Sequence, residues 1–299
     1  MSQHGTLKRY SLIIKKVTED YYPSLAQVLD YLNFKGFEVS KRTIQRDLQQ
    51  LDQEFGLKIS YDRNNNGYHI TEKDKIQLDP FIRFLDIINT ANLLKESFSE
   101  SKNTLQHISF DHNDRFIGLE WMQSILDAMQ TNVILAFSYQ TFFEGPIKEF
   151  ELQPYLLKEY LSRWYLVGCF KASTKLYVFG LDRISNLKIT SNSFEPNKKL
   201  NPIAKFKDII GLVNTDKSKE KVILSFTPTQ GNYIKTLPIH HSQRQLIDSQ
   251  KEYRIELYLI PNFELSQKIL MYGSAVKVIK PKWLADEIKT NLKDAIEQY

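Results

Sequence analysis

The sequence predicts an α+β protein of several domains, and three features of its pattern support this. Apolar residues recur at helical spacing in three stretches within residues 7–55, and a short alternating segment follows them. Residues 133–190 alternate in short runs typical of strands, and residues 221–299 mix strand and helix patterns. A chain of 299 residues, 42% of them hydrophobic, is long enough to build two or three cores.

Three helices are expected at the N-terminus. Apolar residues lie at helical spacing over residues 7–18, which predicts the first helix. Ser24 and Gln27 have the spacing of a capping box and predict the start of the second. Ser40 is placed to cap a third helix that extends to about Phe55.

A β-hairpin is expected directly after these helices. Residues 57–61 and 68–70 have the alternation of strands, and the polar loop between them ends in Asn66-Gly67, a favoured turn pair. Three helices followed by a hairpin are the arrangement of a winged helix-turn-helix, a DNA-binding domain. We assign it to residues 1–72.

The third helix has two contrasting faces. At 100° per residue, Ile44, Leu48 and Leu51 fall within about 60° of one another and form a buried stripe. The opposite face and its edges carry Arg42, Gln45, Arg46, Gln49 and Gln50. Arginine can pair with guanine and glutamine with adenine, so this face suits the major groove. The alternative is an ordinary solvated face.

Phosphate contacts are expected beside this face. Ser40 with the free N–H groups of the first turn, Lys41, and Arg63 at the hairpin tip are placed for them. Arg63 also fits an ordinary loop arginine. Asp47 lies near the apolar flank, so we expect it in an internal ion pair. The full set of expected DNA contacts is Ser40, Lys41, Arg42, Thr43, Gln45, Arg46, Gln49 and Arg63.

A family resemblance rests on the same residues. The stretch from Val39 to Leu48, with Leu51 and the Gly67-Tyr68 pair, resembles the winged helix-turn-helix of DeoR-like regulators over about residues 5–72. It implies a transcription regulator that binds a double-stranded DNA operator. One short helix reads few bases, so we expect a homodimer on an inverted repeat.

Residues 73–116 are expected to form a helical connector. Helical periodicity covers residues 79–99, a polar loop is expected over 97–114, and residues 116–130 predict another amphipathic helix. The apolar surface left over on these two helices would suit a dimer contact.

Five short strands joined by tight turns are expected between residues 133 and 190, which favours a small barrel. The third strand contains Trp164-Tyr165-Leu166. The motifs around it are, in order, Ser138-Tyr139, Gln153-Pro154-Tyr155 and Leu181-Asp182-Arg183-Ile184. This order resembles the WYL domain, named for the tripeptide, and implies an Sm-like barrel over residues 117–192. Residues 205–299 resemble the α+β extension that often follows a WYL domain, here a candidate dimerisation domain.

The WYL resemblance implies a nucleic-acid-derived effector, such as a nucleotide, an oligonucleotide or single-stranded DNA. Phosphate needs cations, and bases stack on aromatic rings. The candidate ligand residues, by position in the motif or beside it, are Tyr139, Lys158, Arg163, Tyr165 and Arg183. Trp164 and Leu166 are expected in the barrel core. The alternatives are that Arg183 only pairs with a carboxylate such as Asp182, and that Tyr139 is only a core tyrosine.

One position departs from the family's pattern. Many WYL domains carry a further basic residue in the strand before Asp-Arg-Ile, whereas this chain has Tyr177-Val178-Phe179-Gly180-Leu181. Three explanations are open: the ligand differs, the C-terminal domain supplies cations such as Lys235 or Arg244, or the domain mainly assembles the dimer.

Several other classes of protein are disfavoured. One cysteine, Cys169, allows neither an internal disulfide nor a Cys-rich zinc site, and we expect it to be a buried thiol. Adjacent His240 and His241 would point to opposite faces of a strand, so no metal is expected. Phosphate-loop, metalloprotease and nucleophile-elbow motifs are missing, so we expect no cofactor, no catalytic residues and no enzyme. Without a membrane span or signal peptide, the chain is expected in the cytoplasm.

The patterns together predict a homodimeric repressor whose DNA binding is controlled by a nucleotide or oligonucleotide at the WYL domain. A net charge of +5 weakly favours a polyanionic partner. The three-domain layout resembles family members that guard phage-defence genes and act as repressors. The alternatives are a nucleic-acid-processing enzyme or its binding subunit, an activator that responds to single-stranded DNA, and a single-strand binder without a regulatory role.

Overall fold

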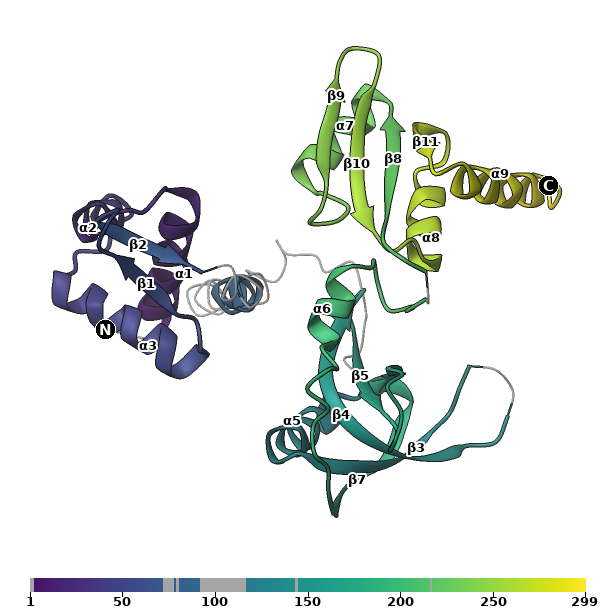
Figure 1. Cartoon of the computed structure of the whole chain (residues 1–299), viewed down its shortest axis with the longest axis horizontal. Helices are drawn as coiled ribbons and strands as arrows, with labels where there is room; N and C mark the ends of the chain where they lie inside the picture. Colours follow the sequence, from purple (N-terminus) through teal and green to yellow (C-terminus); the bar gives the residue numbers. More distant parts are fainter. Residues whose placement is uncertain (1–2, 72–77, 79–80, 92–116, 143–144, 216) are drawn as a thin grey trace, which may run out of the picture. The chain divides into compact units, whose positions relative to one another are not determined.

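The chain forms two compact units, Met1–His112 and Asn113–Tyr299, which Figure 1 shows in purple to blue and in teal to yellow. The computed structural model describes residues 3–71, 78, 81–91, 117–142, 145–215 and 217–299. In this part of the chain no helix is long and apolar enough to cross a membrane.

The first unit begins with three helices, α1 (Gln3–Glu19), α2 (Leu25–Phe34) and α3 (Lys41–Phe55). The predicted capping box of α2 is present, because the Ser24 hydroxyl accepts the N–H of Gln27 and the Gln27 side chain accepts the N–H of Ser24. Ser40 caps α3, and Gly56 ends it in the left-handed conformation with φ 65°. Local sequence signals therefore set the starts of both helices and the end of α3.

The predicted hairpin is formed by the antiparallel strands β1 (Ile59–Asp62) and β2 (Gly67–Ile70). Asn66 takes the left-handed position of the turn, with φ 51°. Gly67 is needed for close approach instead, since a Cβ there would lie 1.9 Å from the carbonyl oxygen of Tyr22. The next N–H, that of Tyr68, donates to the Pro23 carbonyl oxygen at 2.9 Å. The hairpin is thus held against the loop that precedes α2.

Residues 81–91 form a further helix of this unit. Leu85 is completely buried in the core shared with α1, α2 and α3, and the Phe81 ring packs on Phe55 with centroids 4.7 Å apart. The helix expected over 79–99 is therefore confirmed where the structure describes it. The rest of that helix and the polar loop expected over 97–114 lie outside the described residues.

The second unit begins with a five-stranded antiparallel sheet in the order β6-β5-β4-β3-β7 (Figure 1). Its elements are η2 (Leu119–Trp121), α5 (Met122–Thr131), β3 (Val133–Tyr139), β4 (Lys148–Tyr160), β5 (Arg163–Cys169), β6 (Tyr177–Gly180), η3 (Leu181–Arg183) and β7 (Ile184–Ser193). A closed barrel would need the two edge strands to pair, and the described residues contain no such pairing. The sheet is confirmed, and the Sm-like barrel stays a prediction.

The core of this sheet contains the residues expected there. Leu166 is completely buried, and Trp164 packs against the same cluster, so the prediction for both residues is confirmed. The cluster also contains Phe137, Phe179 and Tyr139. Tyr139 is thus a core residue through its ring, whatever its hydroxyl contacts.

A four-stranded antiparallel sheet forms the rest of the second unit, in green and yellow in Figure 1. The elements are α6 (Pro202–Lys207), β8 (Glu220–Phe226), α7 (Pro228–Thr236), β9 (Arg244–Asp248), β10 (Tyr253–Leu259), α8 (Phe263–Met271), η4 (Gly273–Ala275), β11 (Val276–Lys280) and α9 (Lys282–Ile296). The strand order β11-β8-β10-β9 is the ferredoxin-like arrangement. Ile234, Leu265 and Leu284 bring α7, α8 and α9 into one core with the strands.

Residues 208–213, which follow α6, are bound through their backbone. Oε1 of Glu264 accepts the N–H groups of Leu212 and Val213, each at 2.8 Å. The Asn262 amide donates to the carbonyl oxygens of Ile210 at 2.6 Å and Val213 at 3.0 Å. These side chains come from the start of α8, so the segment belongs to the C-terminal sheet and is not a free linker.

Three elements, α6, α7 and β9, were not assigned individually from the sequence pattern. The short helix α6 begins because Asn201 caps it and Pro202 occupies its first turn. In α7, Gly231 weakens the helical signal but allows a close approach, since a Cβ there would lie 2.3 Å from the Cβ of Tyr253. Most side chains of β9 are exposed, so the apolar alternation that reveals a strand is missing.

Candidate nucleic-acid interface and ligand site

The outer face of α3 presents the side chains expected to contact DNA. Arg42, Gln45, Arg46 and Gln49 are all exposed, whereas Ile44 is completely buried. No hydrogen bond or salt bridge within the described residues holds the guanidinium groups of Arg42 or Arg46. These groups are therefore available to a polyanion.

The start of α3 combines a cap with possible phosphate donors. The Ser40 hydroxyl accepts the N–H of Thr43 at 3.2 Å and lies 3.0 Å from the Thr43 hydroxyl. Ser40 is thus already used as a cap. Lys41 is exposed beside it. Phosphate could be bound here by Lys41 and by the unpaired N–H groups of the first turn.

The hairpin tip is an ordered turn that exposes Arg63. The Asp62 carboxylate accepts the N–H groups of Asn64 at 2.8 Å and Asn65 at 2.9 Å. The hydrogen bonds from Asn65 and Asn64 hold the pKa of Asp62 below its ordinary value. The Asp62 carboxylate therefore stabilises the turn through these hydrogen bonds. The Arg63 side chain of the same turn is exposed to solvent.

A small pocket that the sequence did not reveal separates the hairpin from the start of α2. It has a volume of about 390 Å³ and is lined by Ser24, Leu25, Ala26, Tyr61, Asn66 and Tyr68. The Tyr61 hydroxyl donates to the Asn66 side chain. Two tyrosines of the hairpin thus line this pocket beside the N-terminus of α2. The tyrosines of the strands carried no signal that would distinguish them from ordinary strand residues.

Asp47, one of the three acidic residues of α3, is withdrawn from solvent as the sequence predicted. Its carboxylate is completely buried and accepts two hydrogen bonds from the Arg9 guanidinium, of which the Nη2 to Oδ1 distance is 2.9 Å. The hydrogen bonds to Asp47 raise the pKa of Arg9. The negative charge is neutralised inside the unit and leaves the outer face of α3 positive.

The candidate ligand site of the second unit is centred on Arg183. Its guanidinium carbon lies 5.1 Å from the Tyr139 ring centroid and 4.2 Å from that of Phe142. The Tyr139 hydroxyl accepts the Gly180 N–H at 3.3 Å. Phe142, which is 72% exposed, was missing from the predicted set because it lies beyond the end of β3 and carries no motif.

Asp182 lies between two arginines. Its carboxylate is 3.6 Å from Nε of Arg183 and 3.7 Å from Nη1 of Arg163. The Arg183–Asp182 contact expected as an alternative is therefore present. Asp182 Oδ1 and Arg183 Nε are nevertheless buried without a hydrogen bond. The ion pair is too long to satisfy these atoms, so the arginine remains able to bind another acceptor.

Gly180 makes room for this cluster. A Cβ at this position would lie 2.4 Å from Oδ1 of Asp182 and 2.7 Å from Nη2 of Arg183. The side chains of η3 thus occupy the space that a side chain at position 180 would need. A larger residue there, a basic one included, would displace Asp182 or Arg183.

The remaining predicted ligand residues divide into two groups. Tyr165 is the cross-strand partner of Gly180, and burial raises its pKa while Arg163 opposes the rise. The structure thus brings Tyr139, Arg163, Tyr165 and Arg183 together. Lys158 pairs with Tyr165 across the strands, but its ammonium lies 5.2 Å from the Phe206 ring centroid. Lys235 forms a salt bridge with Asp248 at 2.8 Å within the C-terminal sheet.

The histidine pair does not have the arrangement expected from the sequence. His240 and His241 lie in a turn before β9, and Nε2 of each is 2.8 Å from the carbonyl oxygen of Lys207. The expectation that the rings point to opposite faces was wrong because no strand is formed there. Among the described residues no group of three or more His, Cys, Asp or Glu is placed to hold a metal. Cys169 is buried, and burial raises the pKa of its thiol, as expected for an inert cysteine.

Three family models match successive parts of the chain. The model of the FokI D3 domain matches residues 7–64, that of the WYL domain residues 120–189, and that of the WCX domain residues 218–296. These matches support a WYL-domain DNA-binding regulator. The WYL resemblance, predicted from the tripeptide and the motifs around it, is thereby confirmed, and the role as a transcription regulator stays a prediction.

The chain is distantly similar to two solved structures named here. The chain aligns with the proteasome accessory factor B/C (PafBC) of Arthrobacter aurescens at 18% identity and a TM-score of 0.33, over 96% of this chain and 46% of that chain. It aligns with a CRISPR Cas-related protein at 13% identity and a TM-score of 0.40, over 99% and 85% of the two chains. The chain thus spans about half the length of PafBC. No curated protein matches.

Proposed function

We propose that this chain is a transcription regulator in which α3 reads base edges in the major groove of duplex DNA. The observation that carries the proposal is the exposed face of Arg42, Arg46 and Gln49 on a helix whose other side is fixed in the core. Bidentate arginine and glutamine contacts distinguish base pairs in the major groove. Lys41 and Arg63 hold the phosphates on either side.

The proposal extends to an effector that binds at Arg183. A phosphate that replaces the Asp182 carboxylate would pair with the guanidinium groups of Arg183 and Arg163, and a base would stack on the exposed Phe142 ring. We assign a nucleotide or a single-stranded oligonucleotide to this site. Binding would break the contacts of Asp182 with both arginines, so the two states of the site differ in their ion pairs.

The regulator acts as a homodimeric repressor on an inverted repeat, and the effector releases it from the operator. Two α3 helices are needed because one reads too few bases for specific recognition in a genome. Release requires the effector to favour the state with lower operator affinity.

Duplex binding is tested with the DNA upstream of the protein's own gene. Fluorescence anisotropy of the full-length wild type, Arg42→Ala, Arg46→Ala and the control Lys15→Ala compares three exposed cations. Lys15 is 58% exposed on α1 and lies outside the predicted interface. Each α3 variant is expected to lose about 1–3 kcal/mol of binding free energy, and the Lys15 variant much less. Equal binding of upstream and random duplex by wild type at physiological salt would overturn the regulator proposal.

Effector control is tested with Arg183→Gln. The variant is expected to bind the duplex as wild type does but to show no release on addition of a single-stranded oligonucleotide or a cyclic nucleotide. Release at wild-type effector concentrations would remove Arg183 from the site. Release of neither protein by any nucleic-acid-derived probe would leave the DNA-binding proposal standing and contradict the effector class.

A further inference from the structure

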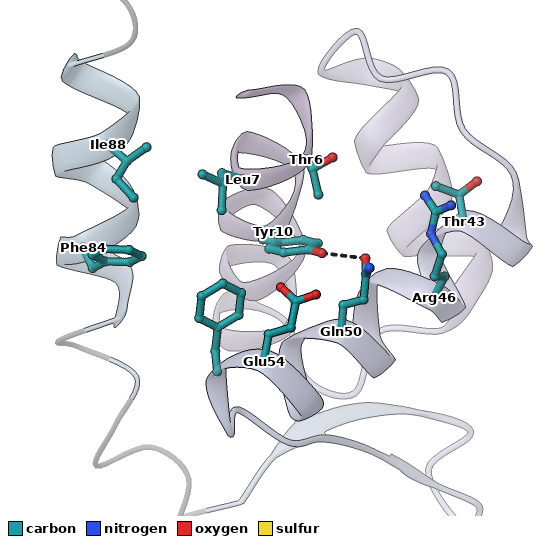
Figure 2. A pocket seen from close by; sticks show the side chains of 10 residues that line it. Thr6, Leu7, Tyr10, Thr43, Arg46, Gln50, Glu54, Phe84 and Ile88 are labelled. Carbon is teal, nitrogen blue, oxygen red and sulfur yellow. Dashed lines mark hydrogen bonds between the residues drawn. The ribbon is translucent and has the colours of Figure 1, made fainter. Parts of the chain in front are cut away.

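A second pocket lies within the first unit, beside α3. It has a volume of about 780 Å³, and Figure 2 shows it between α1, α3 and the helix of residues 81–91. It is lined by Thr6, Leu7, Tyr10, Thr43, Arg46, Gln50, Glu54, Phe55, Phe84 and Ile88. This volume lies within the range of pockets that hold small organic ligands.

One part of the pocket lining is apolar. Phe84 and Ile88 on one side point toward Leu7 on the other (Figure 2). Phe55 also lines the pocket. Phe84 is 45% exposed, although Leu85 beside it is completely buried. The helix is therefore anchored in the core by Leu85. The Phe84 ring, which does not enter the core, faces the pocket instead.

The rest of the lining is polar and carries one cation, Arg46. The Tyr10 hydroxyl donates to Oε1 of Gln50 at 2.8 Å, so these two groups satisfy each other (Figure 2). Arg46 has neither a salt bridge nor a hydrogen bond within the described part of the chain. Glu54 is eight residues further along α3, about 12 Å away along the helix axis. The positive end of the pocket is therefore separated from its negative end.

We propose that this pocket binds a small organic anion with an apolar or aromatic body. Its anionic group pairs with Arg46, with the Thr43 hydroxyl beside it. Its apolar body packs against Leu7, Phe84 and Ile88. A hydrogen-bond donor on the ligand would face Glu54. This site is distinct from the Arg183 cluster, since the two lie in different units of the chain.

The position of Arg46 on α3 couples this site to DNA. At 100° per residue, Arg46 falls about 40° from Arg42 and about 60° from Thr43, between the outer face and the pocket. A ligand that holds the Arg46 guanidinium withdraws it from the duplex. This coupling rests on the proposed function, whereas ligand binding itself does not.

The test uses 8-anilinonaphthalene-1-sulfonate as the probe, because it joins an anionic group to an aromatic body. Its fluorescence is titrated with the full-length wild type, Arg46→Gln, Phe84→Ala and the matched control Arg42→Gln. Arg42 is exposed on the same helix one turn earlier and does not line the pocket. Arg46→Gln and Phe84→Ala are each expected to raise the dissociation constant about tenfold, and Arg42→Gln to leave it unchanged.

The outcomes separate the possible explanations. Superimposable titrations of all four proteins would show that the probe binds elsewhere and would overturn the proposal. Equal weakening by Arg42→Gln and Arg46→Gln would show general attraction to a basic helix and would also overturn it. An effect of Phe84→Ala alone would remove the anion site. Unaltered circular dichroism of the variants confirms that each one is folded.

Competition with DNA tests the coupling separately. Upstream duplex is expected to displace the probe from wild type, and the probe to weaken duplex binding. A wild type that binds the probe with the expected variant pattern but never binds the duplex would support the pocket and overturn the proposed function. A wild type that binds both at once, with unchanged affinities, would overturn the coupling and leave the two sites independent.

Discussion

Arg9 and Asp47 form a buried ion pair that joins α1 to the middle of α3. The two side chains are 1% and 0% exposed, and two hydrogen bonds connect them. A buried pair of this kind fixes orientation more than it adds stability, because desolvation offsets much of the Coulombic attraction. Its effect here is to set the rotation of α3 about its own axis, which decides whether Arg42 and Arg46 face outward.

Removal of one partner should therefore be more harmful than removal of both. Arg9→Met leaves an unpaired buried carboxylate and is expected to lower the local unfolding free energy of α3 by about 3–5 kcal/mol. The double variant Arg9→Met/Asp47→Leu is expected to recover most of this loss. Hydrogen exchange of α1 and α3 peptides in the full chain measures both. Equal losses in the single and double variants would contradict a desolvated pair.

Two glycines of the first unit should respond differently to alanine. Gly67→Ala places a Cβ 1.9 Å from the Tyr22 carbonyl oxygen, so the hairpin must move away from the loop before α2. Gly36→Ala meets nothing within 4 Å and only strains a φ of 83°. We expect about 1 kcal/mol of destabilisation for Gly36→Ala and clearly more for Gly67→Ala. Hydrogen exchange of the hairpin peptides should show faster exchange in Gly67→Ala alone.

Gly180→Ala should alter the effector site without unfolding the sheet. The new Cβ would meet the flexible ends of Asp182 and Arg183, which can move away at little cost to stability. We expect a change in unfolding free energy below about 1 kcal/mol, since no backbone atom is displaced. Effector affinity in anisotropy titrations is expected to change at least about fivefold, because Arg183 must leave its place between Tyr139 and Phe142. Wild-type affinity would show that the placement of Arg183 is irrelevant.

Stability of the second unit should decline as the pH falls below neutrality. Burial and the neighbouring His241 lower the pKa of His240 to about 4, so the folded state keeps this ring neutral where the unfolded chain takes up a proton. The unfolded state therefore binds more protons between pH 6.5 and about 4, and stability falls with pH across that window. The slope is at most about 1.4 kcal/mol per pH unit, and less here because the ring is partly exposed.

The measurement uses the three tryptophans, Trp121, Trp164 and Trp283, which all lie in the second unit. Urea unfolding of the full chain, followed by their fluorescence, is compared between wild type and His240→Gln at several pH values. The variant is expected to show a flatter dependence between pH 6.5 and 4. Parallel slopes in the two proteins would remove His240 as the cause.

Features that depend on neighbouring residues were predictable from the sequence. Ser24 and Ser40 predicted the starts of α2 and α3, because a capping side chain bonds to the N–H group only three residues later. The apolar stripe of α3 identified its outer face, and the position of Asp47 beside that stripe predicted an internal ion pair. The Trp164-Tyr165-Leu166 motif marked the third strand of this region in chain order, which is β5.

Features that depend on residues far apart in the chain were not predictable from the sequence. The sequence did not name Arg9 as the partner of Asp47, since the two are 38 residues apart. Phe142 reaches Arg183 only because β3 and η3 meet in the folded sheet. Gly180 looked like a lost cation until the structure showed two side chains in the space of its missing Cβ. Such relationships arise from tertiary packing, which leaves no periodic trace in a single sequence.

Residues 208–213, which follow α6, form a firmly held connection within the second unit. A connecting segment without backbone hydrogen bonds can change conformation when its neighbours move, whereas a hydrogen-bonded segment moves together with them. Glu264 and Asn262 bind this segment, and Ile260 at the end of β10 donates its N–H to the Asp208 carbonyl oxygen at 2.7 Å. Lys158 of β4 lies against Phe206 at the other end of the same path. A movement of β4 is therefore expected to shift β10 and α8 as well, because α6 connects them.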